Sequence, residues 1–150
     1  MGGTIMITAE QYQQAVETTA RMLKQAGIVI TEEERGRLEV ADFGLQELNK
    51  TGLQILTYIN TDRCCAKELV MTPYQTCPEH RHPTVGKALG KEETFRCRWG
   101  TVYLYVSGKP AGNPACRPPQ GSEAHYTVWK EVCLKPGDQY TLMPDTLHWF

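Results

Sequence analysis

The chain has 150 residues, and its 16 lysines and arginines almost balance 17 aspartates and glutamates, which gives a formal net charge of −1. A chain of this length is expected to form one domain with a sizeable buried core. Its interspersed charges provide no basic footprint for nucleic acid, and it has no apolar run long enough to span a membrane. We therefore expect a protein that binds neither nucleic acid nor a membrane.

The cysteines and the N-terminus together predict a cytoplasmic protein. Residues 1–10 lack the basic and apolar regions of a signal peptide. The chain has six cysteines, an even number that could form a disulfide framework. Without an export signal this is disfavoured, because thiols stay reduced in the cytoplasm. The absence of a C-x-x-C pair also disfavours a zinc ribbon. Most of the cysteines are expected to behave as small buried apolar groups.

The first part of the sequence has a helical pattern. Thr8 and Gln11 have the spacing of a capping box, apolar residues follow at helical intervals, and Gly27 supplies a C-terminal stop. A second capping box, between Thr31 and Glu34, predicts a short turn of helix. We interpret residues 1–36 as a helical extension that packs against the body of the protein.

The remainder, residues 37–150, is rich in β-forming residues. Its short apolar segments are separated by turns that contain glycine, proline and asparagine, which favours a β-sandwich or barrel. The predicted strands are 53–59, 65–71, 94–99, 101–106 and 125–134. Residues 107–123 are expected to form a long loop, and such loops are often functional.

Two of the four histidines, His80 and His82, lie one residue apart. On a strand, the period of two places both imidazoles on one face, where they can begin a metal site. Glu93 begins the next β segment, and His148 follows a second motif far along the chain. This spacing is typical of a cupin, in which three imidazoles and one carboxylate converge on one cation. We therefore predict that His80, His82, Glu93 and His148 are metal ligands.

This ligand set suits Mn²⁺, Fe²⁺, Co²⁺, Ni²⁺ or Zn²⁺, and an octahedral metal would keep two positions open for a chelating substrate. Two other potential ligands are expected to lie outside the set. His125 begins a predicted strand and is expected near the cavity mouth or on the surface. Pro78 bends the chain between Cys77 and His80, so Cys77 is expected to be structural.

Two stretches, "CPEHRHP…GKALGKEETFRCRWGTVYLYV" and "LKPGDQYTLMPDTLHWF", resemble the shorter bacterial form of the D-lyxose isomerase family. The resemblance extends from about Cys65 to Phe150, and "GKEETFRCRWG" and "PDTLHWF" are its most specific parts. It implies a mainly β, single-domain cupin (jelly-roll β-barrel) with an N-terminal helical segment. It also implies a homodimer that prefers Mn²⁺ and uses the same four ligands.

The resemblance further implies the reaction, which is interconversion of D-lyxose with D-xylulose, and of D-mannose with D-fructose, through an enediol intermediate. Such a reaction needs an acid/base group beside the cation. Lys91 lies two residues before Glu93 and would share its face on an extended chain, while Lys67 lies on a predicted strand that leads toward the histidine pair. The resemblance places both lysines in the active site, where a lysine can act as a base or hydrogen-bond donor.

Three expectations stay open at this point. The family implies further residues after Phe150, so we expect a chain trimmed at its C-terminus or lacking that tail, with a second acid/base group there or in a partner subunit. A cupin dioxygenase could use the same ligands with Fe²⁺ or Ni²⁺, although lysines beside the metal argue against it. A non-catalytic cupin could bind a sugar without converting it.

Overall fold

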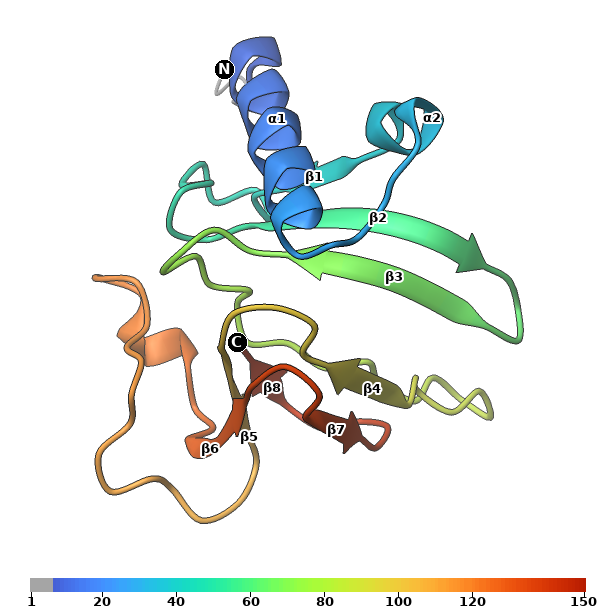
Figure 1. Cartoon of the computed structure of the whole chain (residues 1–150). Coiled ribbons are helices and arrows are strands. Elements are labelled where there is room, and N and C mark those ends of the chain that lie inside the picture. Colours follow the sequence, from blue (N-terminus) through green and yellow to red (C-terminus); the bar gives the residue numbers. More distant parts are fainter. Residues whose placement is uncertain (1–6) are drawn as a thin grey trace, which may run out of the picture. The chain divides into compact units, whose positions relative to one another are not determined.

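The computed structural model describes residues 7–150, and these residues divide between Thr76 and Cys77 into two compact units, 7–76 and 77–150 (Figure 1). Residues 1–6 lie outside the described residues, and part of the segment expected to lack a signal peptide lies there. The expected division into residues 1–36 and 37–150 stays a prediction.

The N-terminal unit begins with two helices, α1 (Ala9–Gln25) and α2 (Glu32–Gly36). Both predicted capping boxes are confirmed. The Thr8 hydroxyl accepts a hydrogen bond from the Gln11 N–H (3.1 Å), and the Gln11 side chain accepts one from the Thr8 N–H (2.9 Å). Thr31 and Glu34 form the same reciprocal pair. Each box satisfies two backbone donors that the start of a helix would otherwise leave unpaired.

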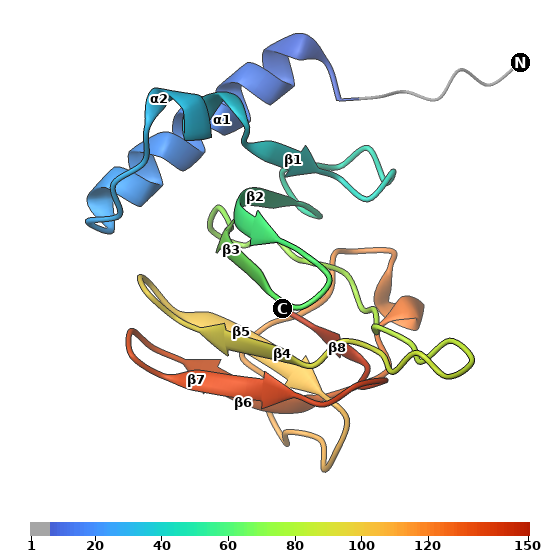
Figure 2. The same cartoon turned by 90° about the vertical axis from the view of Figure 1, so that its right-hand side faces the viewer.

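The same unit contains an antiparallel sheet in the order β1 (Glu39–Ala41), β2 (Leu53–Asn60) and β3 (Cys65–Val70). Helix α1 lies against this sheet (Figures 1 and 2). Apolar residues from the helix, the following loop and the strands form the core between α1 and the sheet. Burial of each such side chain stabilises the fold by about 1.5–3 kcal/mol. The buried members are Val16, Leu23, Ile28, Leu38, Leu56 and Val70.

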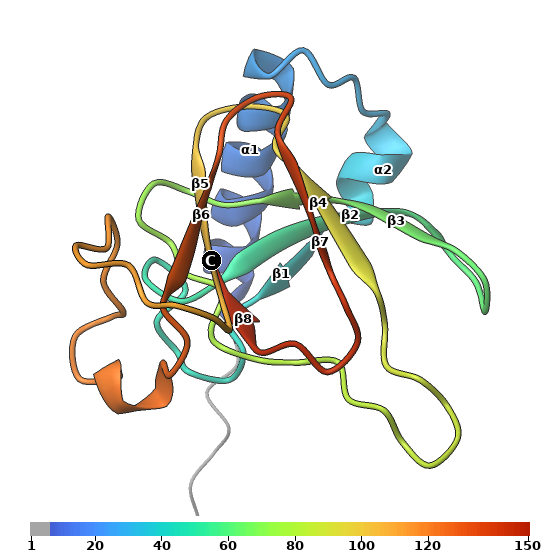
Figure 3. The ribbon, with the colours of Figure 1, turned by 90° about the horizontal axis from the view of Figure 1, so that it is seen from below.

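The C-terminal unit is built from two antiparallel sheets that face each other (Figure 3). One sheet pairs β4 (Glu93–Arg96) with β7 (Gln139–Leu142). The other has the order β6 (Lys130–Leu134), β5 (Val102–Val106) and β8 (His148–Trp149). Their inner faces enclose one apolar core, whose buried members are Cys97, Leu104, Val106, Leu134 and Leu142.

The other face of the β6-β5-β8 sheet carries an aromatic cluster. Tyr105 stacks on Trp149 with ring centroids 4.0 Å apart, and Tyr126 meets Trp149 edge-on. The Tyr105 hydroxyl donates to Glu131 (2.7 Å) and accepts from the Cys116 N–H (2.9 Å). The predicted long loop over residues 107–123, which leads into a short 3₁₀ turn at Glu123–His125, is thereby fastened to the sheet.

The prediction of a mainly β fold with an N-terminal helix is confirmed. Within residues 7–150, however, the strands form three separate sheets and do not close into a barrel. The predicted strand over 125–134 begins only at β6, because its first residue ends the 3₁₀ turn. The pattern missed β1, β7 and β8, which are too short to show a clear alternation. None of the helices in residues 7–150 is both long and apolar enough to cross a membrane.

Candidate metal centre

The four predicted metal ligands come together in the C-terminal unit. His80, His82, Glu93 and His148 each offer one donor atom, and these four atoms lie within 4.8 Å of one another. They come from three separate stretches of chain. The two nearby histidines precede the loop to β4, Glu93 begins β4, and His148 begins β8.

Backbone pairing explains why His80 and His148 meet. The His80 N–H donates to the His148 carbonyl (2.9 Å), and the His148 N–H donates to the His80 carbonyl (3.0 Å). Residues directly opposite in an antiparallel pair project their side chains to the same face, and here the ring centroids are 4.2 Å apart. His148 also lies opposite Val106 of β5, which directs its imidazole toward the core between the sheets.

Glu93 reaches the same place from the opposite sheet. It lies opposite the buried Leu142 in the β4–β7 pair, so its side chain is on the core face. One carboxylate oxygen, Oε2, is 3.0 Å from Nε2 of His82 and 3.5 Å from Nε2 of His148. Three imidazoles from one side and a carboxylate from the other therefore share one focus.

The outer nitrogens of two histidines are fixed by backbone carbonyls. Nδ1 of His80 lies 2.8 Å from the Pro78 carbonyl, and Nδ1 of His148 lies 2.9 Å from the Thr146 carbonyl. A carbonyl only accepts, so each Nδ1 carries the hydrogen and donates it. In a neutral ring this leaves the Nε2 lone pair facing the cluster, which is the arrangement that metal-binding histidines use.

Two buried atoms at the focus have no hydrogen-bond partner among the described residues: Oε2 of Glu93 and Nε2 of His148. They are close to each other, yet both present lone pairs, so their contact is favourable only with a positive charge between them. Leaving such atoms unpaired costs about 1–3 kcal/mol each. A divalent cation would satisfy both at once, and the residues therefore fit a metal ion.

Electrostatics keep the centre in a form that can bind a cation. Burial lowers the pKa of His148, and the nearby His80 lowers it further, which favours the neutral imidazole. Burial and the Glu93 charge raise the pKa of the Cys77 thiol to about 12. Among the described residues, the cluster includes neither Cys77 nor His125.

The local structure around the ligands differs from the prediction in one respect. His80 and His82 do not lie on a regular strand. His80 forms an isolated bridge to His148, and His82 has no strand assignment. The two imidazoles still converge, in an edge-to-face arrangement with centroids 5.2 Å apart.

The two predicted catalytic lysines lie in different units. Lys91 is exposed and precedes the first residue of β4, so the strand alternation used to predict its direction does not extend to it. Lys67 is exposed on β3 of the N-terminal unit, where it pairs with Thr57. The catalytic role of both lysines stays a prediction.

Sequence reasoning missed two carboxylates beside the ligands. Glu79 accepts three hydrogen bonds from Thr127 and Val128, at 2.6–3.0 Å, next to His80. Asp145 accepts two from Thr84, and these bonds lower its pKa. Their partners, Thr84 and Thr127, are distant in the chain, so no local pattern predicts these hydrogen bonds. The only signal in the sequence is that Glu79 and Asp145 lie inside the stretches "CPEHRHP" and "PDTLHWF".

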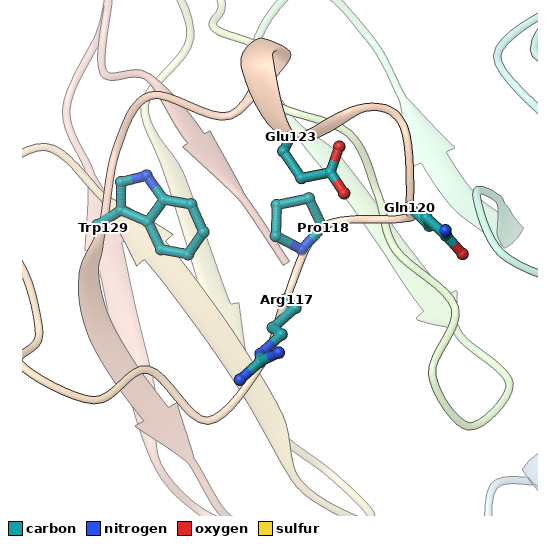
Figure 4. A pocket seen from close by; sticks show the side chains of 5 residues that line it. All are labelled: Arg117, Pro118, Gln120, Glu123 and Trp129. Carbon is teal, nitrogen blue, oxygen red and sulfur yellow. The ribbon is translucent and has the colours of Figure 1, made fainter.

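A hollow of about 500 Å³ lies along the long loop (Figure 4). Trp129, Pro118 and Glu123 border it, together with Arg117 and Gln120. It contains none of the four clustered residues and is a separate feature of the surface.

The chain is similar in sequence to three curated sugar isomerases. It is 59% identical over 145 residues to the D-lyxose/D-mannose isomerase of Thermosediminibacter oceani, covering 97% of this chain and 80% of that protein. It is 57% identical to the D-lyxose ketol-isomerase of a Thermofilum species, covering 97% and 81%. It is 56% identical to the D-lyxose ketol-isomerase of Cohnella laeviribosi, covering 93% and 77%. No protein-family model matches the chain.

Solved structures show the same fold at low sequence identity. The ligand-free L-ribose isomerase of Cellulomonas parahominis has a TM-score of 0.73 at 18% identity, covering 96% of this chain and 76% of that one. The L-ribose isomerase of Acinetobacter sp. DL28, in complex with L-ribose, has a TM-score of 0.71 at 18% identity, covering 95% and 74%.

Proposed function

The chain belongs to the D-lyxose ketol-isomerase family of aldose–ketose isomerases, and we propose that its activity depends on a divalent metal. We further propose that it interconverts D-lyxose with D-xylulose and D-mannose with D-fructose. The observation that carries the metal proposal is the convergence of three imidazoles and one carboxylate on one focus, with two buried lone-pair atoms left unpaired. The names of the relatives support the sugars.

In this proposal His80, His82, Glu93 and His148 hold the cation. Three nitrogen donors and one oxygen donor suit Mn²⁺, and also Fe²⁺, Co²⁺, Ni²⁺ or Zn²⁺. When bound, the metal would supply Lewis-acid polarisation of the sugar's carbonyl and hydroxyl oxygens. The Pro78 and Thr146 carbonyls would keep two of the imidazoles oriented for this task.

Isomerisation moves one proton from C2 to C1 of the aldose and another from the C2 hydroxyl to the C1 oxygen. We propose Lys91 as the main acid/base group, since it lies two residues from a ligand in the same unit. Lys67 is the second candidate, and its support is the family resemblance. Proton transfer by a positioned side chain of this kind accelerates a reaction by about 10²–10⁴-fold.

We also propose that the native metal is Mn²⁺, that the protein forms a homodimer, and that it is located in the cytoplasm. All six cysteines are free, which fits a reducing compartment. The family resemblance supports the metal and the dimer.

The test is a panel of metals and sugars. The full chain is stripped with a chelator, one divalent metal is restored at a time, and ketose production is followed from D-lyxose, D-mannose and L-ribose. We expect no turnover without metal and the highest turnover with Mn²⁺ on D-lyxose or D-mannose. Equal turnover in the stripped and reloaded protein would contradict metal dependence, and no turnover of any sugar would contradict the proposed substrates.

A further inference from the structure

Asp145 joins the two stretches of chain that carry the histidine ligands. Its carboxylate accepts hydrogen bonds from the Thr84 N–H (2.7 Å) and the Thr84 hydroxyl (2.6 Å). Its own backbone N–H donates to the carbonyl of His82 (3.2 Å). Thr84 lies two residues after His82, and Asp145 lies three residues before His148, so this one residue connects both ligand segments.

The connection extends to the loop that leads to Glu93. The Thr84 hydroxyl also accepts a hydrogen bond from the Gly90 N–H (3.1 Å), which closes the two ends of the loop over residues 84–90. Gly90 packs so closely on the His82 carbonyl that a Cβ there would overlap it. The hydrogen bond between Thr84 and Gly90 therefore closes the loop that connects His82 to Glu93, and Asp145 fixes Thr84 by two further hydrogen bonds.

The backbone of Asp145 is also special. Its φ is +64°, in the left-handed region that residues other than glycine rarely occupy. Asparagine and aspartate tolerate this region better than most residues, at a cost of about 1 kcal/mol. An aspartate rather than a glycine at this position is explained by the carboxylate, which makes the two bonds to Thr84.

We propose that Asp145 is a positioning residue for the metal centre, acting through Thr84 to hold His82 at the distance from His148 at which both imidazoles face one cation. This inference rests on the proposed function of the four clustered residues as metal ligands. Asp145 is not itself a member of the cluster. Asp145 contacts the ligand segments at Thr84 and at the His82 carbonyl rather than at the imidazoles. Its loss should therefore change the positions of the proposed ligands more than the overall stability of the fold.

The test uses substitutions that separate the side chain from the backbone. Asp145→Gly removes the carboxylate and keeps the positive φ, Thr84→Val removes the hydroxyl at constant shape, and Thr84→Ser restores it. Asp138→Gly is the matched control, because Asp138 accepts one bond from the Lys135 N–H (3.0 Å) in a turn that carries no ligand. Each full-length protein is stripped of metal, and its Mn²⁺ affinity, its visible Co²⁺ spectrum and the melting temperature of the stripped form are measured.

We expect Asp145→Gly and Thr84→Val to weaken Mn²⁺ binding by about 10–100-fold, as loss of an outer-shell support does elsewhere. Their Co²⁺ spectra should change, whereas Thr84→Ser and Asp138→Gly should match the parent protein. Unchanged affinity and spectrum in both Asp145→Gly and Thr84→Val would overturn the inference, as would equal weakening in Asp138→Gly. If the parent protein binds neither Mn²⁺ nor Co²⁺, the proposed function itself fails.

Discussion

His80 and His148 exchange two backbone hydrogen bonds, of 2.9 Å and 3.0 Å, although they belong to motifs at opposite ends of the C-terminal unit. The pairing brings their rings together without any contribution from the ring nitrogens that face the cluster. The scaffold of the centre is therefore set by the backbone, and a change in one ligand side chain should leave the fold intact.

Glu93, the proposed carboxylate ligand, offers the cleanest test of that separation. Glu93→Gln keeps the size of the side chain and removes its charge, so we expect at least about a 100-fold loss of Mn²⁺ affinity, more than an outer-shell change produces. Ketose formation should fall with the metal content. Metal per chain after dialysis and the far-ultraviolet circular dichroism spectrum would be measured together. Full retention of metal in the folded variant would remove Glu93 from the ligand set.

Lys91 should affect turnover without affecting the metal. Lys91→Met removes the amine and keeps most of the aliphatic chain, so kcat should fall by about 10²–10⁴ while bound Mn²⁺ is unchanged. Lys87→Met is the matched control, because Lys87 is an exposed lysine on the same loop and has no proposed role. If the two variants turn over sugar at the same rate, Lys91 is not the base, and Lys67→Met becomes the next variant to assay.

Tyr105 should contribute to stability through its hydroxyl. Tyr105→Phe keeps the stack on Trp149 but removes the hydroxyl that donates to the Glu131 carboxylate and accepts from the Cys116 N–H. We expect the free energy of unfolding to fall by about 1–3 kcal/mol. Urea unfolding measures it, with Tyr74→Phe as the control, because Tyr74 is fully exposed. Equal midpoints for the two variants would show that the network adds nothing.

The thiol of Cys77 should be inert near neutral pH. Its pKa of about 12 means that the reactive thiolate is on the order of 10⁻⁴ of the total at pH 8. Because the folded-state pKa is raised, the neutral thiol predominates at every pH below about 12, and alkylation of Cys77 should stay slow near neutral pH and increase about tenfold for each pH unit toward 12. Iodoacetamide labelling followed by mass spectrometry should modify the exposed Cys64 and Cys65 first. Labelling of Cys77 at the same rate in the folded protein would contradict this environment.

The sequence predicted well those features that depend on neighbouring residues. The caps of α1 and α2 are local, because Thr8 and Thr31 need partners only three residues away. The four clustered residues, His80, His82, Glu93 and His148, were also identified from the sequence, by cupin spacing and by the family resemblance, and their role as metal ligands stays a prediction. The regular strand expected at His80 and His82 is absent, because only His80 forms a bridge.

Features that depend on distant partners could not be predicted in the same way. The Asp145 connection to Thr84 spans 61 residues, and the Glu79 connection to Thr127 spans 48. No periodicity in the sequence relates such pairs. Strands β7 and β8 were missed for a related reason, since a strand of two to four residues is defined by its partner rather than by its own alternation.

The convergence of His80, His82, Glu93 and His148 on one cation is tested most directly by crystals of the full chain soaked in Mn²⁺. An anomalous difference map collected at the manganese edge locates the metal without reference to any assumed site. We predict one strong peak per chain, in bonding contact with the three Nε2 atoms and the Glu93 carboxylate. A map with no peak at this cluster, in crystals whose mother liquor holds saturating Mn²⁺, would contradict the central claim.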